Sequence, residues 1–215
     1  MPEAILFDLD GTLADTAPDL GGALNRLRAE FGLAPLPLER LRPVTSEGSR
    51  GMLRLGFGLT PHHPDYDEYR QRFLDIYDAA LCVHTQLFEG IAPLLDALEA
   101  RDLPWGVVTN KPERFTLPLI AALGLSERAA CVVSGDSAPA PKPAPDPLFL
   151  ACRMIDRVPD RCLYVGDDAR DIEAGRAAGM TTVAVRYGYL GEHLPPEEWG
   201  ADHLIDHPLD LLKLA

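Results

Sequence analysis

Short apolar runs, each ended by a polar residue, alternate with helical patterns along most of the chain. The first run covers residues 4–7 and leads directly into Asp8. Runs without polar alternation are typical of strands buried on both faces, as in a parallel sheet. The same pattern predicts further strands at residues 105–108, 131–133, 162–165 and 182–185, and a weak edge strand at 201–205.

Helical periodicity separates these predicted strands. Apolar side chains fall on one face in four segments, and Gly124 and Gly179 follow two of them as expected C-terminal caps. Strand–helix alternation of this kind predicts an α/β fold with a Rossmann-like parallel sheet and crossover connections. The four predicted helices cover residues 91–101, 113–123, 145–155 and 170–178.

Residues from about 15 to 85 break the alternation, because they carry helical periodicity only. Asp15-Thr16 is an expected N-cap, and Pro18 falls where a first helical turn tolerates proline. A crossover of about 70 residues would be far longer than usual, so we predict an inserted helical domain. The predicted division is a core of residues 1–14 and 88–215 with a helical cap of residues 15–87. Two apolar faces are expected within the cap, one of Leu20, Leu24, Leu27 and Phe31, the other of Tyr66, Tyr69, Phe73, Ile76, Tyr77 and Ala80.

Charge and composition limit the possible partners. The chain has 20 basic and 33 acidic residues, a net charge of −13, which argues against binding to nucleic acid or to anionic membranes. An anionic substrate would then need a local concentration of positive charge. There is no apolar run of roughly 18 residues and no signal-peptide pattern, so we expect a soluble, cytoplasmic protein. The four cysteines lack zinc-ligand spacing and are expected to be free thiols: Cys82, Cys131, Cys152 and Cys162.

Polar side chains occur where four predicted strands end. They are Asp8 and Asp10, Thr109, Lys142, and Asp167. In open parallel sheets the binding crevice lies beyond the carboxyl ends of the strands, so these residues are predicted to converge there. The alternative at each position is a turn, a helix cap or a solvated charge.

Each of these residue types suits one task in phosphoryl transfer. One carboxylate of the pair Asp8 and Asp10 can attack phosphorus, while the other protonates the leaving oxygen and later activates water. Lys142, held between two prolines, could neutralise phosphate charge. Asp167 offers a carboxylate of the kind that Mg²⁺ prefers, so we predict Mg²⁺ as the cofactor, and Asp171 could orient water or a ligand. Thr109, together with its neighbour Asn110 and with Thr12, is predicted to bind the phosphoryl group.

These residues, in this order, resemble the haloacid dehalogenase superfamily. The resemblance rests on Asp8-Leu9-Asp10-Gly11-Thr12, Thr109, Lys142 and the segment 166–171, and it extends over the whole chain. It implies the phosphatase branch, because dehalogenases lack the second aspartate. It also implies that Asp8 is the nucleophile, that Asp10 is the general acid and base, and that Asp8, the Asp10 carbonyl and Asp167 bind the metal, supported by Asp171.

Narrower resemblances concern the substrate. Residues 10–20 are similar to the phosphoglycolate phosphatase subgroup. Other stretches are similar to the phosphatases of N-acetylmuramic acid 6-phosphate in cell-wall recycling: residues 83–84, 87–90, 105–112, 184–189 and 199–202. Both substrates carry a carboxylate. Arg50, in the candidate substrate loop 46–50, is predicted to meet it, with a solvated helix arginine as the alternative.

The predicted function is therefore hydrolysis of a small phosphate ester by a monomer or homodimer. A sugar phosphomutase shares the same motifs and remains an alternative. A non-enzymatic receiver-type module also uses carboxylates, Thr, Lys and Mg²⁺ at strand ends. The order of its motifs differs, however, and it has no helical cap, so the sequence argues against it.

Overall fold

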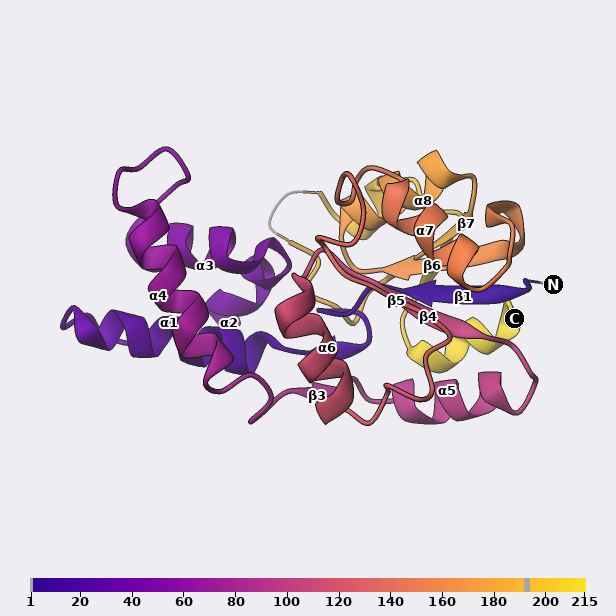
Figure 1. Ribbon diagram of the computed structural model, residues 1–215, viewed down its shortest axis with the longest axis horizontal. Coiled ribbons are helices and arrows are strands. Elements are labelled where there is room, and N and C mark those ends of the chain that lie inside the picture. Colours follow the sequence, from indigo (N-terminus) through magenta and orange to yellow (C-terminus); the bar gives the residue numbers. More distant parts are fainter. Residues whose placement is uncertain (1, 192–193) are drawn as a thin grey trace.

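The computed structural model describes residues 2–191 and 194–215. A parallel sheet with helices on both faces occupies one end of the molecule, and a helical lobe extends from the other (Figure 1). Both termini lie at the end of the sheet far from the lobe. Among the described residues, no helix has both the length and the apolar character that a membrane crossing would need.

The sheet has six strands in the order β5-β4-β1-β6-β7-β8, and every neighbouring pair is parallel. The first strand, β1, therefore lies at the centre, and all four of its residues are fully buried. This arrangement confirms the predicted α/β fold with a Rossmann-like parallel sheet. The strands are β1 (Ala4–Phe7), β4 (Trp105–Val108), β5 (Val132–Val133), β6 (Cys162–Gly166), β7 (Thr181–Val185) and β8 (His203–Ile205).

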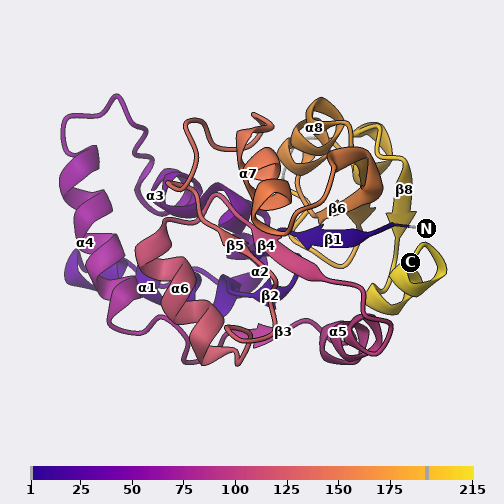
Figure 2. The ribbon, with the colours of Figure 1, turned by 45° about the vertical axis from the view of Figure 1, so that its right-hand side comes forward.

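Helices cover both faces of the sheet and form two separate apolar layers. Ile5 and Phe7 point into the layer made with α5 (Ile91–Glu99), α6 (Glu113–Ala122) and the C-terminal 3₁₀ helix η4 (Pro208–Lys213). Ala4 and Leu6 point the opposite way, toward α7 (Asp146–Met154) and α8 (Ala169–Ala178). Figure 2 shows these two helix layers on either side of β1. Successive side chains of a strand alternate between faces, which is why one apolar run serves both layers. Two further 3₁₀ turns are η2 (Pro159–Arg161) and η3 (Pro196–Glu198).

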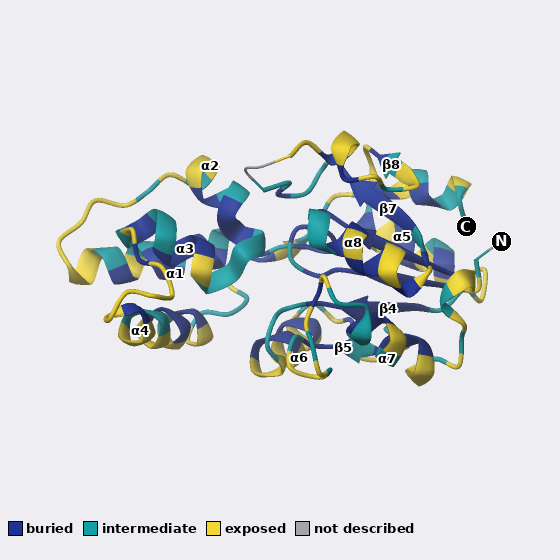
Figure 3. Cartoon of the chain, turned by 90° about the horizontal axis from the view of Figure 1, so that it is seen from above, coloured by how far each residue is buried: buried dark blue, intermediate teal, exposed yellow. Residues whose placement is uncertain are grey.

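The helical lobe has an apolar cluster of its own. Leu24, Phe73 and Tyr77 are among its buried members, and Phe115 joins them from α6 of the sheet region. Figure 3 shows buried segments of α3 and α4 on the sides where these helices approach each other. The lobe consists of α1 (Ala17–Glu30), α2 (Leu38–Leu41), the 3₁₀ helix η1 (Arg42–Glu47), α3 (Gly48–Phe57) and α4 (Tyr66–Asp78).

Two details of the lobe differ from the pattern-based expectation. Phe31 lies beyond the end of α1 and is 51% exposed, so it does not continue the buried face of Leu20, Leu24 and Leu27. Thr16 does stand at the N-cap position of α1, but its side chain makes no capping hydrogen bond. Its hydroxyl donates to Asp10 instead.

The chain enters and leaves the lobe through a short antiparallel ladder. β2 (Ala14–Asp15) pairs with β3 (Gln86–Leu87), and two-residue strands of this kind give no periodic signal in a sequence. Close by, the buried carboxylate of Asp19 accepts hydrogen bonds from the backbone amides of residues 83–85. The ladder and Asp19 fasten the two connections together. The division into a core of residues 1–14 and 88–215 and a cap of 15–87 stays a prediction.

Candidate active site

Asp8 and Lys142 form a buried ion pair where β1 ends. The Lys142 ammonium lies 2.8 Å from Asp8 Oδ1, and only 4% of the lysine is exposed. The same ammonium donates hydrogen bonds to Asp171 Oδ1 (2.7 Å), to the Tyr164 hydroxyl (2.8 Å) and to the Val108 carbonyl (3.1 Å). Burial alone would lower the pKa of Lys142, but the charges of Asp171 and Asp8 outweigh it and raise the pKa. The lysine is therefore a fixed positive charge beside the Asp8 carboxylate.

Asn110 holds the loop that carries this lysine. Its side-chain amide donates to the Lys142 carbonyl (2.9 Å) and accepts from the Lys142 backbone N–H (2.9 Å). The Asn110 side chain is thus engaged through its oxygen and one N–H, and its binding of phosphate stays a prediction. Among the groups of Asn110, its backbone N–H remains a candidate donor to a phosphoryl oxygen.

Three buried carboxylates meet beside this ion pair. Each of Asp8, Asp167 and Asp171 offers an oxygen that lies within 4.8 Å of the others. Burial raises the pKa of Asp8 to about 7, and the charge of Asp171 adds to this while Lys142 opposes it. Burial and the charges of Asp8 and Asp171 likewise raise the pKa of Asp167 well above its usual range. Three carboxylates with one lysine leave an excess of two negative charges when ionised, so the donor set fits a divalent cation.

Asp167 is held in place from two directions. The Thr12 hydroxyl donates to Oδ1 (2.9 Å), and the Tyr189 backbone N–H donates to Oδ2 (2.9 Å). Thr12 is completely buried, so its hydroxyl positions a carboxylate and is not open to a phosphate as predicted. Gly11 and Gly188 allow the close packing around Asp167: a Cβ at either would lie 2.1 Å or 2.2 Å, respectively, from the nearest Asp167 atom.

Asp171 belongs to the first turn of α8 and serves two neighbours. Besides Lys142, it accepts a hydrogen bond from the Asp168 backbone N–H (3.1 Å), as part of a capping box. Arg170 pairs with the Asp168 carboxylate and also donates to the Ser46 carbonyl of the helical lobe (2.9 Å). The start of α8 thus links the carboxylate cluster to the lobe.

Asp10 lies in the turn after β1, with its side chain between a threonine and a lysine. The Thr16 hydroxyl donates to Asp10 Oδ1 (2.5 Å), and the Lys111 ammonium lies 3.0 Å from the same oxygen. The side chain of Lys111 is 7% exposed, and its ammonium is 4.9 Å from the centre of the Tyr77 ring in α4. Lys111 was not predicted as a site residue. The available signal was its rarity, because Lys111, Lys142 and Lys213 are the only lysines among 20 basic residues.

The remaining predicted residues lie at different distances from this cluster. Thr109 is buried at the end of β4, and its hydroxyl accepts from the Lys111 backbone N–H (3.1 Å), which leaves its own proton available. Ser46, from the predicted substrate loop, reaches Asp167 Oδ2 (3.3 Å). Arg50, four residues later, lies on α3 with an exposed side chain. The structure joins the loop to the site through Ser46, and it does not place Arg50 in the carboxylate cluster.

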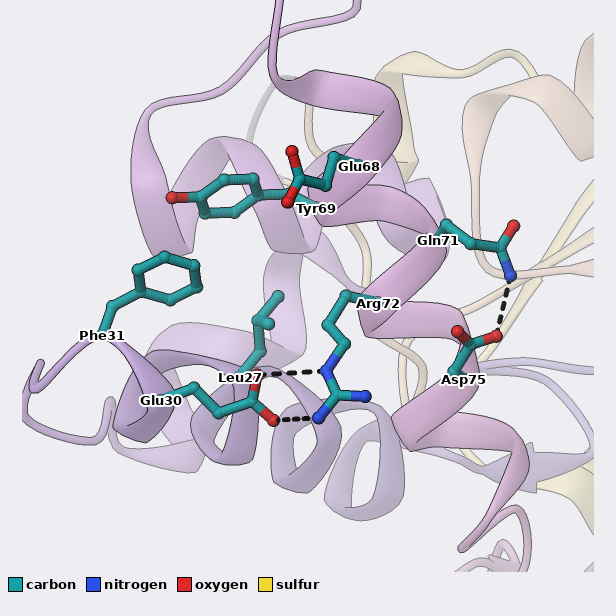
Figure 4. Close-up of a pocket in the computed structure, with 8 residues that line it drawn as sticks. All are labelled: Leu27, Glu30, Phe31, Glu68, Tyr69, Gln71, Arg72 and Asp75. Carbon is teal, nitrogen blue, oxygen red and sulfur yellow. Dashed lines mark hydrogen bonds and ion pairs between the residues drawn. The ribbon is translucent and has the colours of Figure 1, made fainter.

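A separate pocket lies on the lobe between α1 and α4 (Figure 4). Its volume is about 490 Å³, and an ion pair between Arg72 and Glu30 (2.8 Å) crosses it. None of the residues that line it is a predicted site residue. They are Leu27, Glu30, Phe31, Glu68, Tyr69, Gln71, Arg72 and Asp75.

Comparisons with known proteins agree with this geometry. Over 212 residues the chain is 47% identical to an N-acetylmuramic acid 6-phosphate phosphatase of Pseudomonas aeruginosa, covering 99% of this chain and 94% of the relative. It is 44% identical to a phosphoglycolate phosphatase of Xanthomonas campestris over 218 residues, covering 100% of this chain and 96% of that one. A crystal structure of a predicted phosphoglycolate phosphatase from Haemophilus somnus superposes with a TM-score of 0.86 at 27% identity, covering 99% of this chain and 97% of that chain.

The family assignment follows from the extent of the match. Residues 5–185 match the haloacid dehalogenase-like hydrolase family, a span that includes the helical lobe and every residue of the carboxylate cluster. The two relatives described above are named as phosphatases, the structural neighbour is named as a predicted one, and the matches cover nearly the whole length of each. The chain therefore belongs to the haloacid dehalogenase-like hydrolases and is an enzyme of their phosphatase branch.

Proposed function

We propose that the protein is a Mg²⁺-dependent phosphomonoester hydrolase that forms an aspartyl phosphate on Asp8. One observation carries the proposal: the Asp8 carboxylate lies 2.8 Å from a buried ammonium and next to two further buried carboxylates. A carboxylate can attack a phosphate ester only where positive charge offsets the repulsion between the two anions. Lys142 supplies part of that charge.

The first chemical step is assigned to Asp8 and Asp10. An Asp8 oxygen attacks phosphorus, the bond from phosphorus to the ester oxygen breaks, and the protonated Asp10 carboxyl gives its proton to the leaving oxygen. Lys142 holds the phosphoryl oxygens and the nucleophile together. The Thr109 hydroxyl and the Asn110 backbone N–H are proposed as further donors to the phosphoryl group.

The second step returns Asp8 to its starting state. Asp10, now ionised, takes a proton from water as that water attacks phosphorus, and the bond between phosphorus and Asp8 breaks to release phosphate. Thr16 and Lys111 hold the Asp10 carboxylate in one orientation through both steps. Both contacts are made to Oδ1 of Asp10. The other oxygen, Oδ2, therefore stays available, first to donate the proton and then to accept one.

Magnesium is the proposed cation for the carboxylate cluster. Asp8 and Asp167 would hold it directly with the Asp10 carbonyl, and Asp171, whose oxygens already accept from Lys142, Tyr164 and the Asp168 N–H, would support the site. When bound, the ion supplies positive charge that polarises the phosphoryl group and lowers the repulsion between anions. Oxygen donors without sulfur or imidazole favour such a hard cation.

The proposed substrate is a small phosphate ester that carries a carboxylate. The relatives named for N-acetylmuramic acid 6-phosphate and for phosphoglycolate support these two candidates at 47% and 44% identity. We propose that the helical lobe, residues 15–87, acts as a cap that excludes bulk water over the site. A cytoplasmic monomer or homodimer remains the proposed setting.

Replacing the nucleophile tests the reaction. In Asp8→Asn, release of phosphate from either ester should fall by a factor of about 10³ or more, while the thermal unfolding transition stays cooperative. Full activity of this variant would refute the mechanism. Equal turnover by the native enzyme with and without EDTA would refute the metal requirement. A phosphomutase would instead yield an isomerised sugar phosphate and little free phosphate.

A further inference from the structure

Tyr77 carries a buried hydroxyl that the structure leaves without a regular hydrogen bond. The residue lies on α4 of the helical lobe and is 1% exposed, yet among the described residues its hydroxyl oxygen forms no hydrogen bond of regular geometry, and Lys111 is the charged group that interacts with it. A buried unpaired hydroxyl usually costs about 1–3 kcal/mol, so native structures rarely keep one without a reason. Burial raises the pKa of Tyr77, so its hydroxyl keeps its proton and can act as a donor.

This hydroxyl belongs to a small group of polar side chains at the junction of lobe and sheet region. The Lys111 ammonium lies 4.9 Å from the centre of the Tyr77 ring and 3.0 Å from Asp10 Oδ1. The Tyr77 ring also packs against Phe115 of α6, with ring centres 5.5 Å apart. These contacts hold the tyrosine in place, so its orphan hydroxyl is a fixed feature of the site and not a mobile side chain.

We propose that Tyr77 and Lys111 form a subsite for the leaving group, which binds an oxygen on the carbon next to the ester carbon. The inference rests on the proposed function, because Asp10 is the group that protonates the ester oxygen. A pair of donors beside Asp10 lies next to the ester oxygen that leaves with the product. Counting outward from that oxygen, the next substrate atoms able to accept a hydrogen bond are oxygens on the carbon bonded to the ester carbon.

Both candidate substrates carry an oxygen at that position. In phosphoglycolate it is a carboxylate oxygen, and in N-acetylmuramic acid 6-phosphate it is the ring oxygen. An ammonium with a phenol recognises either, but a hydrogen bond to a charged acceptor is stronger than one to a neutral acceptor. Ethyl phosphate has the same ester carbon and adjacent carbon without any oxygen there, so it reports phosphoryl transfer without the subsite.

The variant Tyr77→Phe isolates the hydroxyl. It keeps the ring against Lys111 and Phe115, and it removes an unpaired group, so the melting temperature should stay equal or rise. Lys111 is less suitable for this test, because it also holds Asp10 and its loss would affect every ester. Tyr66→Phe is the matched control, since Tyr66 is a buried tyrosine of the same helix in the apolar cluster of the lobe.

The experiment compares kcat/KM for the three esters, and measures their affinities by calorimetry in the inert Asp8→Asn background. If the subsite binds the carboxylate oxygen of phosphoglycolate, Tyr77→Phe should lower kcat/KM and affinity for that ester about 10-fold or more. If it binds the ring oxygen of N-acetylmuramic acid 6-phosphate, the loss for that ester should be about 3-fold. The values for ethyl phosphate should not change in either case. The larger loss identifies which oxygen occupies the subsite.

Other outcomes overturn the proposal. Equal loss for all three esters would mean that Tyr77 acts through Asp10, and no loss for any ester would mean that the hydroxyl has no role in binding. The two readouts also separate this inference from the proposed function. If Tyr77→Phe loses affinity selectively but the native enzyme releases no phosphate from these esters, the subsite is supported and the hydrolase is refuted. If the native enzyme turns the esters over and Tyr77→Phe shows no selective loss, the hydrolase is supported and the subsite is refuted.

Discussion

The carboxylate cluster predicts that Mg²⁺ stabilises the protein more as the pH rises. On folding, burial raises the pKa of Asp8 from 3.8 to about 7. The stability gained from this retained proton is therefore fully present below pH 3.8 and is lost as the pH rises through 7. A bound cation must displace the proton at low pH, but it meets an ionised carboxylate at high pH.

The size of the effect follows from the shift. At a pH of about 5.5, displacing a proton from a group with a pKa of about 7 costs about 2 kcal/mol, and at a pH of about 8 it costs almost nothing. The pKa of Asp167 is raised in the same direction and adds to the difference. For a protein of this size, about 2 kcal/mol corresponds to roughly 4–8 °C in melting temperature.

Thermal unfolding with and without MgCl₂ at the two pH values measures this difference. Other titrating groups contribute equally to both samples, so the shift caused by the metal isolates the cluster. NaCl at matched ionic strength controls for screening of the acidic surface, and Asp8→Asn should reduce the pH dependence. A metal-induced shift of the same size at both pH values would refute the role assigned to the buried protons.

Two further substitutions test how the site and its connections are built. In Asp19→Ala, the backbone amides of residues 83–85, of which only Thr85 is buried, lose their acceptor. The free energy of unfolding in urea should therefore fall by about 2 kcal/mol, against almost no change for the exposed Asp78→Ala, and equal effects would contradict the assignment. In Gly188→Ala, the new Cβ would lie 2.2 Å from Asp167 Cβ and would displace this carboxylate. Calorimetry should therefore show an affinity for Mg²⁺ about 10-fold weaker than that of the native protein. Gly22→Ala is the control and should bind Mg²⁺ normally, because the space around its Cβ is open. Unchanged affinity of the Gly188 variant would show that Asp167 is not a ligand.

The elements of the sheet could be predicted because burial on both faces leaves a simple signature. Every residue of β1 is apolar, and the pattern changes abruptly at Asp8, where the chain leaves the sheet. The ladder of β2 and β3 could not be predicted in this way. Each strand has two residues, and its pairing depends on the lobe returning the chain to its starting point.

The site was predictable to the extent that strand ends converge. That rule places Asp8 and Asp167 at one edge of the sheet, but Lys142 follows the end of β5 by nine residues and reaches the site through its loop. The rule also does not say which atoms pair. Thr12 and Asn110 illustrate the difference: both lie next to the predicted chemistry, yet their side chains hold Asp167 and the backbone of Lys142.

The hydrogen bonds made by tyrosine hydroxyls at the site could not be predicted from the sequence. Tyr164 lies within β6 and has the pattern of a core aromatic, although its hydroxyl accepts a hydrogen bond from Lys142 (2.8 Å). Tyr189 lies in a loop after β7, and its hydroxyl donates to Asp15 (3.0 Å) at the entrance to the lobe. Their roles depend on where a side chain's end lies in three dimensions, which neither spacing nor composition encodes.

Movement of the lobe can be tested at its apolar contact with the sheet region. Phe115 of α6 is 2% exposed and packs against Tyr77 of the lobe. Phe115→Leu keeps an apolar side chain but loses an aromatic pair of about 1 kcal/mol, which should lower the ratio of closed to open protein about 5-fold.

If the lobe closes over the site with hinges near residues 14–15 and 88–90, this loss has two consequences. KM should rise, by at most about 5-fold and by less the more the native protein is closed, with a smaller change in kcat, because only the closed form binds substrate well. In small-angle X-ray scattering, the variant should have a larger radius of gyration than the native protein, and the difference should disappear with Mg²⁺ and phosphate. Phe149→Leu, at a partly exposed position on α7, is the control. An unchanged KM together with a constant radius of gyration would mean that the lobe is fixed, and that water is excluded from Asp8 by a permanently closed site.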